Sequence, residues 1–180
     1  CVTVPRLCVN LSPRQLRAPD LVETVIGALE DSGLAASRLE LGIPESCLTE
    51  KGQDAAELLA RLKAVGVRLS IDDFGSGHSA FTLLRRLPAD CLKISQTYVR
   101  DAVAGAETSD VITAIVAVAH GLHMIVVAPG IETIDQYAAM ADPGCDMAQG
   151  FVLARPMPPA ETLAMLRQPP RPPQPITPPV

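Results

Sequence analysis

The chain alternates between short apolar runs and longer segments in which apolar residues recur three and four positions apart. The runs are rich in Val, Ile and Leu, as in the strands of a parallel sheet that is buried on both faces. They predict six strands, at 6–11, 38–43, 67–71, 91–94, 124–128 and 146–150. The segments that follow them predict helices near 20–32, 53–65, 79–87, 107–120, 133–141 and 160–167.

Alternation of strands and helices on this spacing predicts an α/β fold with right-handed crossovers. A closed (β/α)₈ barrel needs eight such units, and the chain supplies six. Two architectures therefore stay open, an incomplete TIM-type barrel and an open doubly wound sheet. We expect residues 1–167 to form one domain. Residues 168–180 are more than half proline, which predicts an exposed, extended tail.

Composition narrows the functional classes. Of the 180 residues, 48% are hydrophobic and 19% charged, which is typical of a globular domain. The net charge of −5 argues against nucleic acid as a partner, because no basic face is available to displace counterions. Five scattered cysteines without a C-x-x-C spacing favour reduced thiols and a cytoplasmic location. The longest apolar stretch, 111–119, is too short for a membrane segment.

Polar side chains stand where the predicted strands end, which is where a barrel of parallel strands places its site. They are Asn10, Glu45, Asp72, Asp73, Lys93, Ser95 and Gln149. Carboxylate and amide oxygens are the ligands that Mg²⁺ and Mn²⁺ prefer. Two adjacent acids can bridge a metal pair of the kind that cleaves phosphodiesters. An Asp-Asp pair before Phe-Gly is also a common turn.

Five stretches of the chain resemble successive motifs of the EAL domain, in family order and at family spacing over about residues 6–160. They are CVNLSPRQL (8–16), LELGIPES (39–46), SIDDFGSGHSAFTLLRRLPADCLKIS (70–95), IVVAPGIET (125–133) and QGFVLARPMP (149–158). The resemblance implies a modified TIM barrel with one reversed strand. It also implies Mg²⁺- or Mn²⁺-dependent hydrolysis of cyclic di-GMP to a linear dinucleotide.

The resemblance assigns roles to individual residues. Asn10, Glu45 and Asp72 would bind metal, and Asp73 would serve a second metal ion. Lys93 would lie near the nucleophilic water, and Gln149 would help to position the reacting groups. The DDFGSG turn (72–77) would link the metal site to dimer contacts, so that a homodimer is expected.

The chain departs from the family pattern at several ligand positions. Pro129 replaces the first glutamate of the A-E-G-V-E motif, and Ser95 replaces the acid of K-I-D. In LELGIPES, Gly42 and Pro44 stand in place of a glutamate and a threonine. The stretch with the Glu-x-Leu motif, another ligand, would lie upstream of residue 1 on one of two absent strands. We therefore expect at most one weakly held ion.

Three hypotheses follow from these departures. The first is a degenerate EAL domain that binds cyclic di-GMP, or a protein partner, without efficient hydrolysis. The second is an active phosphodiesterase completed by upstream sequence, favoured by the intact Asp72, Asp73, Lys93 and Gln149. The third is a truncated remnant without either activity.

Overall fold

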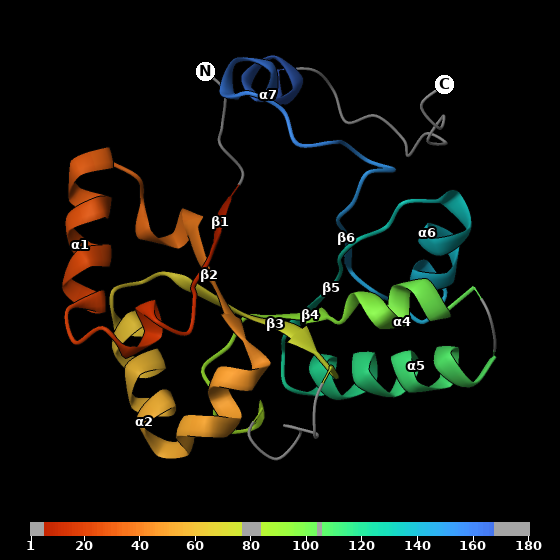
Figure 1. The fold of residues 1–180 in the computed structure, drawn as a ribbon, viewed down its shortest axis with the longest axis horizontal. Coiled ribbons are helices and arrows are strands. Elements are labelled where there is room, and N and C mark those ends of the chain that lie inside the picture. The colour runs from red at the N-terminus through yellow and green to blue at the C-terminus, as the bar shows by residue number, and fades with distance from the viewer. Residues whose placement is uncertain (1–5, 77–83, 104–105, 168–180) are drawn as a thin grey trace.

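A computed structural model describes residues 6–76, 84–103 and 106–167. Its centre is a six-stranded sheet in which every neighbouring pair is parallel, and the strand order follows the chain (Figure 1). The strands are β1 (Leu7–Asn10), β2 (Leu39–Pro44), β3 (Arg68–Phe74), β4 (Cys91–Ile94), β5 (Ile125–Ala128) and β6 (Met147–Ala148). Because a doubly wound sheet reverses its strand order, this topology confirms the incomplete barrel.

Helices follow the strands, and most of them cover the sheet, whereas the last one buries no residue. They are α1 (Leu21–Ser32), α2 (Glu45–Ala64), α4 (Gln96–Asp101), α5 (Ala106–Gly121), α6 (Ile134–Ala141) and α7 (Pro159–Leu166), with short 3₁₀ turns at Gln15–Arg17 and Ala36–Arg38. Figure 1 shows α1 and α2 beside β1 to β3, and α4 to α6 beside β4 to β6. Most of the helix predicted near 79–87 and the whole tail at 168–180 lie outside the described residues.

Two differences from the predicted helices bear on the site. Helix α2 begins at Glu45, eight residues before the predicted start at 53. Helix α4 was not predicted at all, although Ser95 is an N-cap residue whose hydroxyl accepts a hydrogen bond from the Thr97 amide. None of the helices in the described ranges is both long and apolar enough to cross a bilayer.

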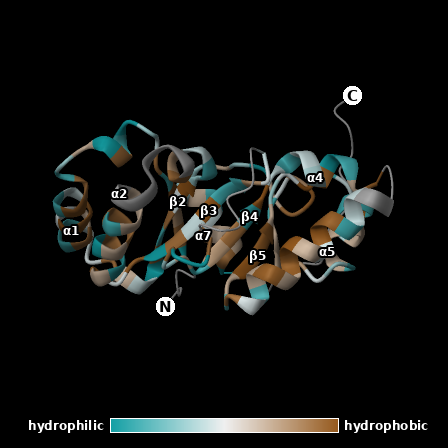
Figure 2. Ribbon diagram, turned by 90° about the horizontal axis from the view of Figure 1, so that it is seen from below, coloured by the Kyte–Doolittle hydropathy of each residue, from teal (hydrophilic) through white to brown (hydrophobic). Residues whose placement is uncertain are grey.

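The two faces of the sheet differ in polarity. Alternate strand positions carry Leu and Ile, which are buried against the helices, as with Leu41, Leu69 and Leu92. Figure 2 shows the hydrophobic residues of β5 beside those of α5. The positions between them carry Glu40, Ser70 and Lys93, which are buried and polar. The sheet is thus covered on one face by an apolar core, while its concave face holds polar groups that need partners.

Two aspartates form hydrogen bonds that link the amino ends of neighbouring strands. Asp90 precedes β4, and its Oδ2 accepts the Leu69 amide hydrogen at 2.9 Å and pairs with Lys63. Asp146 precedes β6, and its Oδ2 accepts the Val126 amide hydrogen at 2.7 Å and lies 2.9 Å from His120 Nε2. Partial burial alone would raise the pKa of Asp146, but these two contacts outweigh it and lower that pKa.

We predict that Asp146→Asn destabilises the fold by about 1 kcal/mol near pH 6, because a charge-assisted hydrogen bond and an ion pair weaken at a half-exposed site. Since the pKa is lowered on folding, this contribution is complete above the ordinary pKa of about 3.9. It is lost as the pH falls through the lower pKa of folded Asp146. Urea unfolding of both proteins from pH 6 to pH 2.5 measures the difference.

Asp110→Asn, at an exposed position of α5, is the control and should leave the unfolding free energy unchanged across the same range. A constant difference between wild type and Asp146→Asn at every pH would contradict the assignment.

Candidate functional site

The carboxyl ends of the strands surround one cavity of about 700 Å³, which we call the strand-end cavity. It brings together five of the six residues to which the resemblance assigns a role: Asn10, Asp72, Asp73, Lys93 and Gln149. Parallel strands that end at the same edge explain this convergence, although up to 139 positions separate these residues. Ser95 and Pro129, which stand where the family pattern has acids, line the same cavity. The other lining residues are Cys8, Ser76, Ile94, Gln96, Thr97 and Arg100.

An ion pair occupies the floor of the strand-end cavity. Lys93 Nζ lies 3.0 Å from Asp72 Oδ1 and donates a hydrogen bond to Cys8 Sγ at 3.1 Å. The Ser70 hydroxyl donates to the same Asp72 oxygen at 2.9 Å. The two side chains of the pair are only 10% and 16% exposed, so their attraction is weakly screened. Lys93 therefore supplies the positive charge that the Asp72 carboxylate needs.

The protonation states fit this arrangement. Burial alone would lower the pKa of the Lys93 ammonium, but its hydrogen bond to Cys8 and the charge of Asp72 raise the pKa above its ordinary value. Burial raises the pKa of the Cys8 thiol, so Cys8 is a neutral acceptor at pH 7. The cavity floor thus holds a charged Lys93 ammonium beside a neutral Cys8 thiol over the physiological pH range.

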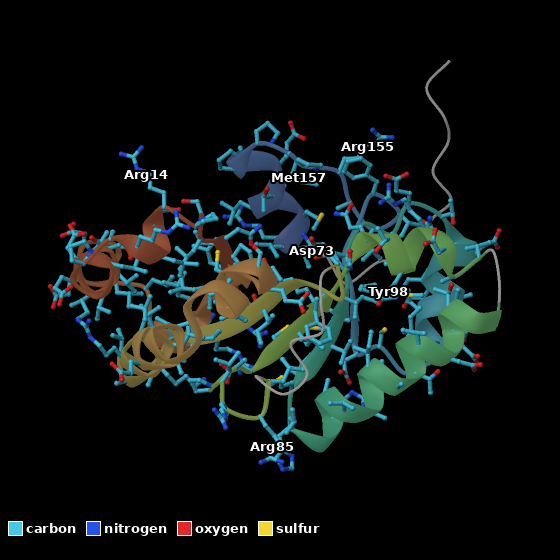
Figure 3. The ribbon with its side chains drawn as sticks, turned by 60° about the horizontal axis from the view of Figure 1, so that its bottom comes forward. Arg14, Asp73, Arg85, Tyr98, Arg155 and Met157 are labelled. Carbon is cyan, nitrogen blue, oxygen red and sulfur yellow. The ribbon has the colours of Figure 1, made fainter. Side chains whose placement is uncertain are left out.

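Asp73 reaches the cavity through an irregularity in β3. The pairing of β3 with β4 shifts register between Ile71 and Phe74, and Asp73 adopts a left-handed conformation with φ of 60°. Aspartate tolerates this conformation better than most residues do. The bulge lets the consecutive Asp72 and Asp73 line one cavity, where strand alternation alone would place them on opposite faces. Asp73 is exposed (Figure 3), so water screens its charge from that of Asp72.

Gly42 lies directly beneath the predicted ligands. A Cβ atom built on Gly42 would overlap Asp72 Oδ2 and would lie 2.7 Å from Asn10 Oδ1. The oxygens of Asn10 and Asp72 thus fill the space that a side chain at this position needs. Sequence analysis placed Gly42 among several replaced positions, whereas the structure places it directly against two of the predicted ligands, Asn10 and Asp72. The family glutamate at this position would have provided a carboxylate between these two oxygens.

These donors do not fit a pair of metal ions. No three His, Cys, Asp or Glu residues within the described ranges come together as a metal-binding group. Asp72, Asp73, Asn10 and Gln149 supply two carboxylates and two amides, and Lys93 already pairs with one of those carboxylates. A single divalent ion could use Asn10, Asp72 and Asp73, in competition with the Lys93 ammonium.

Glu45 has a different position from the other predicted ligands. It does not line the strand-end cavity. It is the first residue of α2, it is buried, and its Oε2 accepts the Gly75 amide hydrogen at 2.9 Å. On this geometry Glu45 holds the glycine turn after β3, and the ligand role stays a prediction that this contact does not favour.

Tyr98 of α4 contacts the same glycine from the other side. The Tyr98 hydroxyl donates to the Gly75 carbonyl at 3.4 Å. A Cβ on Gly75, which has φ of 89°, would lie 2.5 Å from the Tyr98 ring. Glu45 and Tyr98 therefore clamp both backbone groups of Gly75 and fix the turn that carries Asp73. The Ser-x-Thr cap at 95–97 is the sequence signal that could have revealed α4.

Comparison with known proteins gives a consistent result. The model of the family described as the EAL domain matches residues 3–156. The cyclic di-GMP phosphodiesterase NbdA of Pseudomonas aeruginosa is 41% identical over 162 residues, which are 90% of this chain and 21% of that protein. The chain thus spans about a fifth of the length of the curated relatives that it matches.

Two solved structures extend the comparison. The PaMucR phosphodiesterase in its cyclic di-GMP complex is 37% identical, with a TM-score of 0.83 over 87% of this chain and 64% of that chain. BlrP1 of Klebsiella pneumoniae, with manganese and cyclic di-GMP, is 29% identical, with a TM-score of 0.78 over 84% of this chain and 39% of that chain.

We predict that Glu45→Ala increases hydrogen exchange at the Gly75 amide by about tenfold, because that amide loses its buried acceptor. Glu45→Gln keeps an oxygen in place and should show a smaller increase. Exchange measured by NMR provides the test, with the Ile94 amide as an internal reference that stays constant. Equal exchange at Gly75 in all three proteins would show that the contact does not hold the turn.

We predict a coupling of about 1–3 kcal/mol between Lys93 and Asp72, because removal of one partner leaves the other charge poorly solvated. Urea unfolding of Lys93→Met, Asp72→Asn and the double variant gives the coupling. The control is the exposed pair Arg61–Glu23, whose side chains are 56% and 63% exposed and whose coupling should stay below about 1 kcal/mol. Additive effects at Lys93 and Asp72 would rule out the proposed pairing.

Proposed function

This chain belongs to the EAL domain family, and we propose that within it the chain acts as a cyclic di-GMP receptor without efficient hydrolysis. The ligand follows from the relatives, since NbdA is a cyclic di-GMP phosphodiesterase and PaMucR is solved with cyclic di-GMP. One observation carries the loss of hydrolysis. The cation that contacts Asp72 belongs to Lys93, while Gly42, Ser95 and Pro129 supply no carboxylate around it.

The donor set explains why hydrolysis should be slow. Two divalent ions in a complete site activate water and stabilise the entering and leaving oxygens. Removing a residue that merely orients a metal ligand costs about 10–100-fold in metal affinity or activity. This chain has lost several direct ligand positions. Lys93, which the resemblance places near the attacking water, is engaged by Asp72 and Cys8.

The residual donors still support weak binding of one Mg²⁺ or Mn²⁺ ion through Asn10, Asp72 and Asp73. BlrP1 is solved with manganese and with calcium, each together with cyclic di-GMP, which supports a divalent ion as the relevant class. The ion would compete with the Lys93 ammonium for Asp72, so its affinity should be low.

An active phosphodiesterase is the second candidate, because Asp72, Asp73, Lys93 and Gln149 meet in one cavity. The chain covers 64% of the PaMucR chain, and a carboxylate from polypeptide outside this chain would bring the donor set closer to that of a two-metal site.

We predict that the protein binds cyclic di-GMP with micromolar affinity in calorimetry. With Mn²⁺ and cyclic di-GMP, chromatography should detect no linear product above a blank without enzyme. Binding without product supports the receptor. Clear turnover would establish the phosphodiesterase instead, and the absence of both binding and turnover would identify a remnant.

A Pro129→Glu variant tests whether the lost ligand limits metal binding. The added carboxylate at the end of β5 should strengthen Mn²⁺ binding by about tenfold or more. Pro156→Glu, at an exposed position outside the cavity lining, adds the same charge and should leave Mn²⁺ affinity unchanged. Equal affinities in the two variants would show that residue 129 does not reach the ion.

A further inference from the structure

The charged residues of the strand-end cavity are Asp72, Asp73, Lys93 and Arg100. A phosphodiester that enters this cavity meets two carboxylates, which repel it. The family site would neutralise them with metal ions, but the donors that remain do not fit two ions. Because Lys93 also competes with a single weakly held ion for Asp72, the binding of an anion depends mainly on the cations that the chain itself provides.

The Lys93 ammonium already has close partners within the protein. Its ammonium lies 3.0 Å from one Asp72 oxygen and 3.2 Å from the other, and it also donates to Cys8. The pair with Asp72 is close to neutral as a whole. Lys93 can therefore offset the repulsion from Asp72, but it leaves the charge of Asp73 and of the incoming phosphodiester without a counter-ion.

Arg100 differs from Lys93 in this respect. It is exposed, it lines the cavity, and its guanidinium makes no hydrogen bond or ion pair with another residue in the described part of the chain. It shares its side of α4 with Gln96 and Thr97, which also line the cavity, as residues one turn apart do. An uncommitted guanidinium beside two carboxylates is well suited to bind a phosphate oxygen pair in bidentate geometry.

The position of Arg100 is held by the rest of α4. Val99 is fully buried, Ser95 caps the helix, and Tyr98 donates to Gly75 on the turn that carries Asp73. The contact between Tyr98 and Gly75 therefore links α4, which carries Arg100, to the turn that carries Asp73. A binding group on a fixed element loses little conformational freedom when its ligand arrives.

We propose that Arg100 binds a phosphodiester group of cyclic di-GMP in place of a metal ion, so that recognition does not depend on divalent cations. This inference rests on the proposed function. Lys93 neutralises Asp72, and Arg100 neutralises the ligand. The loss of acids at 42, 95 and 129 then favours binding, because each lost carboxylate removes a repulsion that the protein no longer offsets with metal.

The test is calorimetry with cyclic di-GMP on the whole chain, once in EDTA and once in Mn²⁺. We expect wild-type dissociation constants that agree within about threefold. In EDTA, Arg100→Ala should weaken binding at least about tenfold, since a charge-assisted bidentate contact is lost. Arg100→Lys keeps the positive charge but not the bidentate guanidinium, so it should lose less affinity than Arg100→Ala. Arg85→Ala is the matched control, because Arg85 is exposed and lies far from Asp73 (Figure 3).

The outcomes separate this inference from the proposed function. Wild-type binding that requires Mn²⁺ would overturn the inference and leave the receptor intact. So would equal affinities of Arg100→Ala and Arg85→Ala in EDTA. Absence of wild-type binding under both conditions would overturn the proposed function itself. If Arg100→Ala fails to fold by circular dichroism, Arg100→Lys decides, and affinity equal to wild type then counts against the inference.

Discussion

The ion pair between Lys93 and Asp72 is the interaction on which the arrangement of the cavity depends. A parallel sheet with one polar face must provide a counter-charge for every buried carboxylate, and at the carboxyl ends of the strands the chain does so with its own ammonium. Ser70 and Cys8 complete the hydrogen bonding around the pair. Without this pair, the Asp72 carboxylate would have no cationic partner in a cavity that Asp73 also lines. Ser95 and Pro129, which follow β4 and β5, add no negative charge to the cavity, so that one lysine is sufficient for Asp72.

The fold and the position of the cavity could be predicted from sequence because both follow from local patterns. Apolar runs locate strands within one or two residues, except that β3 continues to Phe74 and β6 is shorter than expected, and parallel strands necessarily end at a shared edge. What sequence reasoning missed depends on registers and on contacts between distant segments. It took the strands as apolar on both faces, while alternate positions such as Glu40 and Lys93 form a polar face. It did not single out Gly42, because Gly42 contacts Asn10 and Asp72 only through the pairing of β1, β2 and β3.

Two contacts that sequence reasoning did not foresee concern Gly75. Glu45 follows a strand in sequence, which made it resemble the ligands, but it begins a helix whose first turn faces the β3 turn. Helix α4 has six residues, too few for a periodic pattern to stand out, so that its cap was the only signal. Together these two elements fix the turn that carries Asp73. The chain thus keeps the contacts that support the turn even where predicted ligand positions are replaced, a combination that agrees with the receptor role proposed above.

The position of the Asn10 and Asp72 oxygens over Gly42 also limits how the cavity could be redesigned. A glutamate introduced at 42 alone would have to push both oxygens aside and disturb the pairing with Lys93, before any cation is present to offset the added negative charge. The effect of a side chain at 42 therefore depends on the residues at 10 and 72, and substitutions at these three positions should not be additive. An engineered metal site in this cavity would have to change the three positions together.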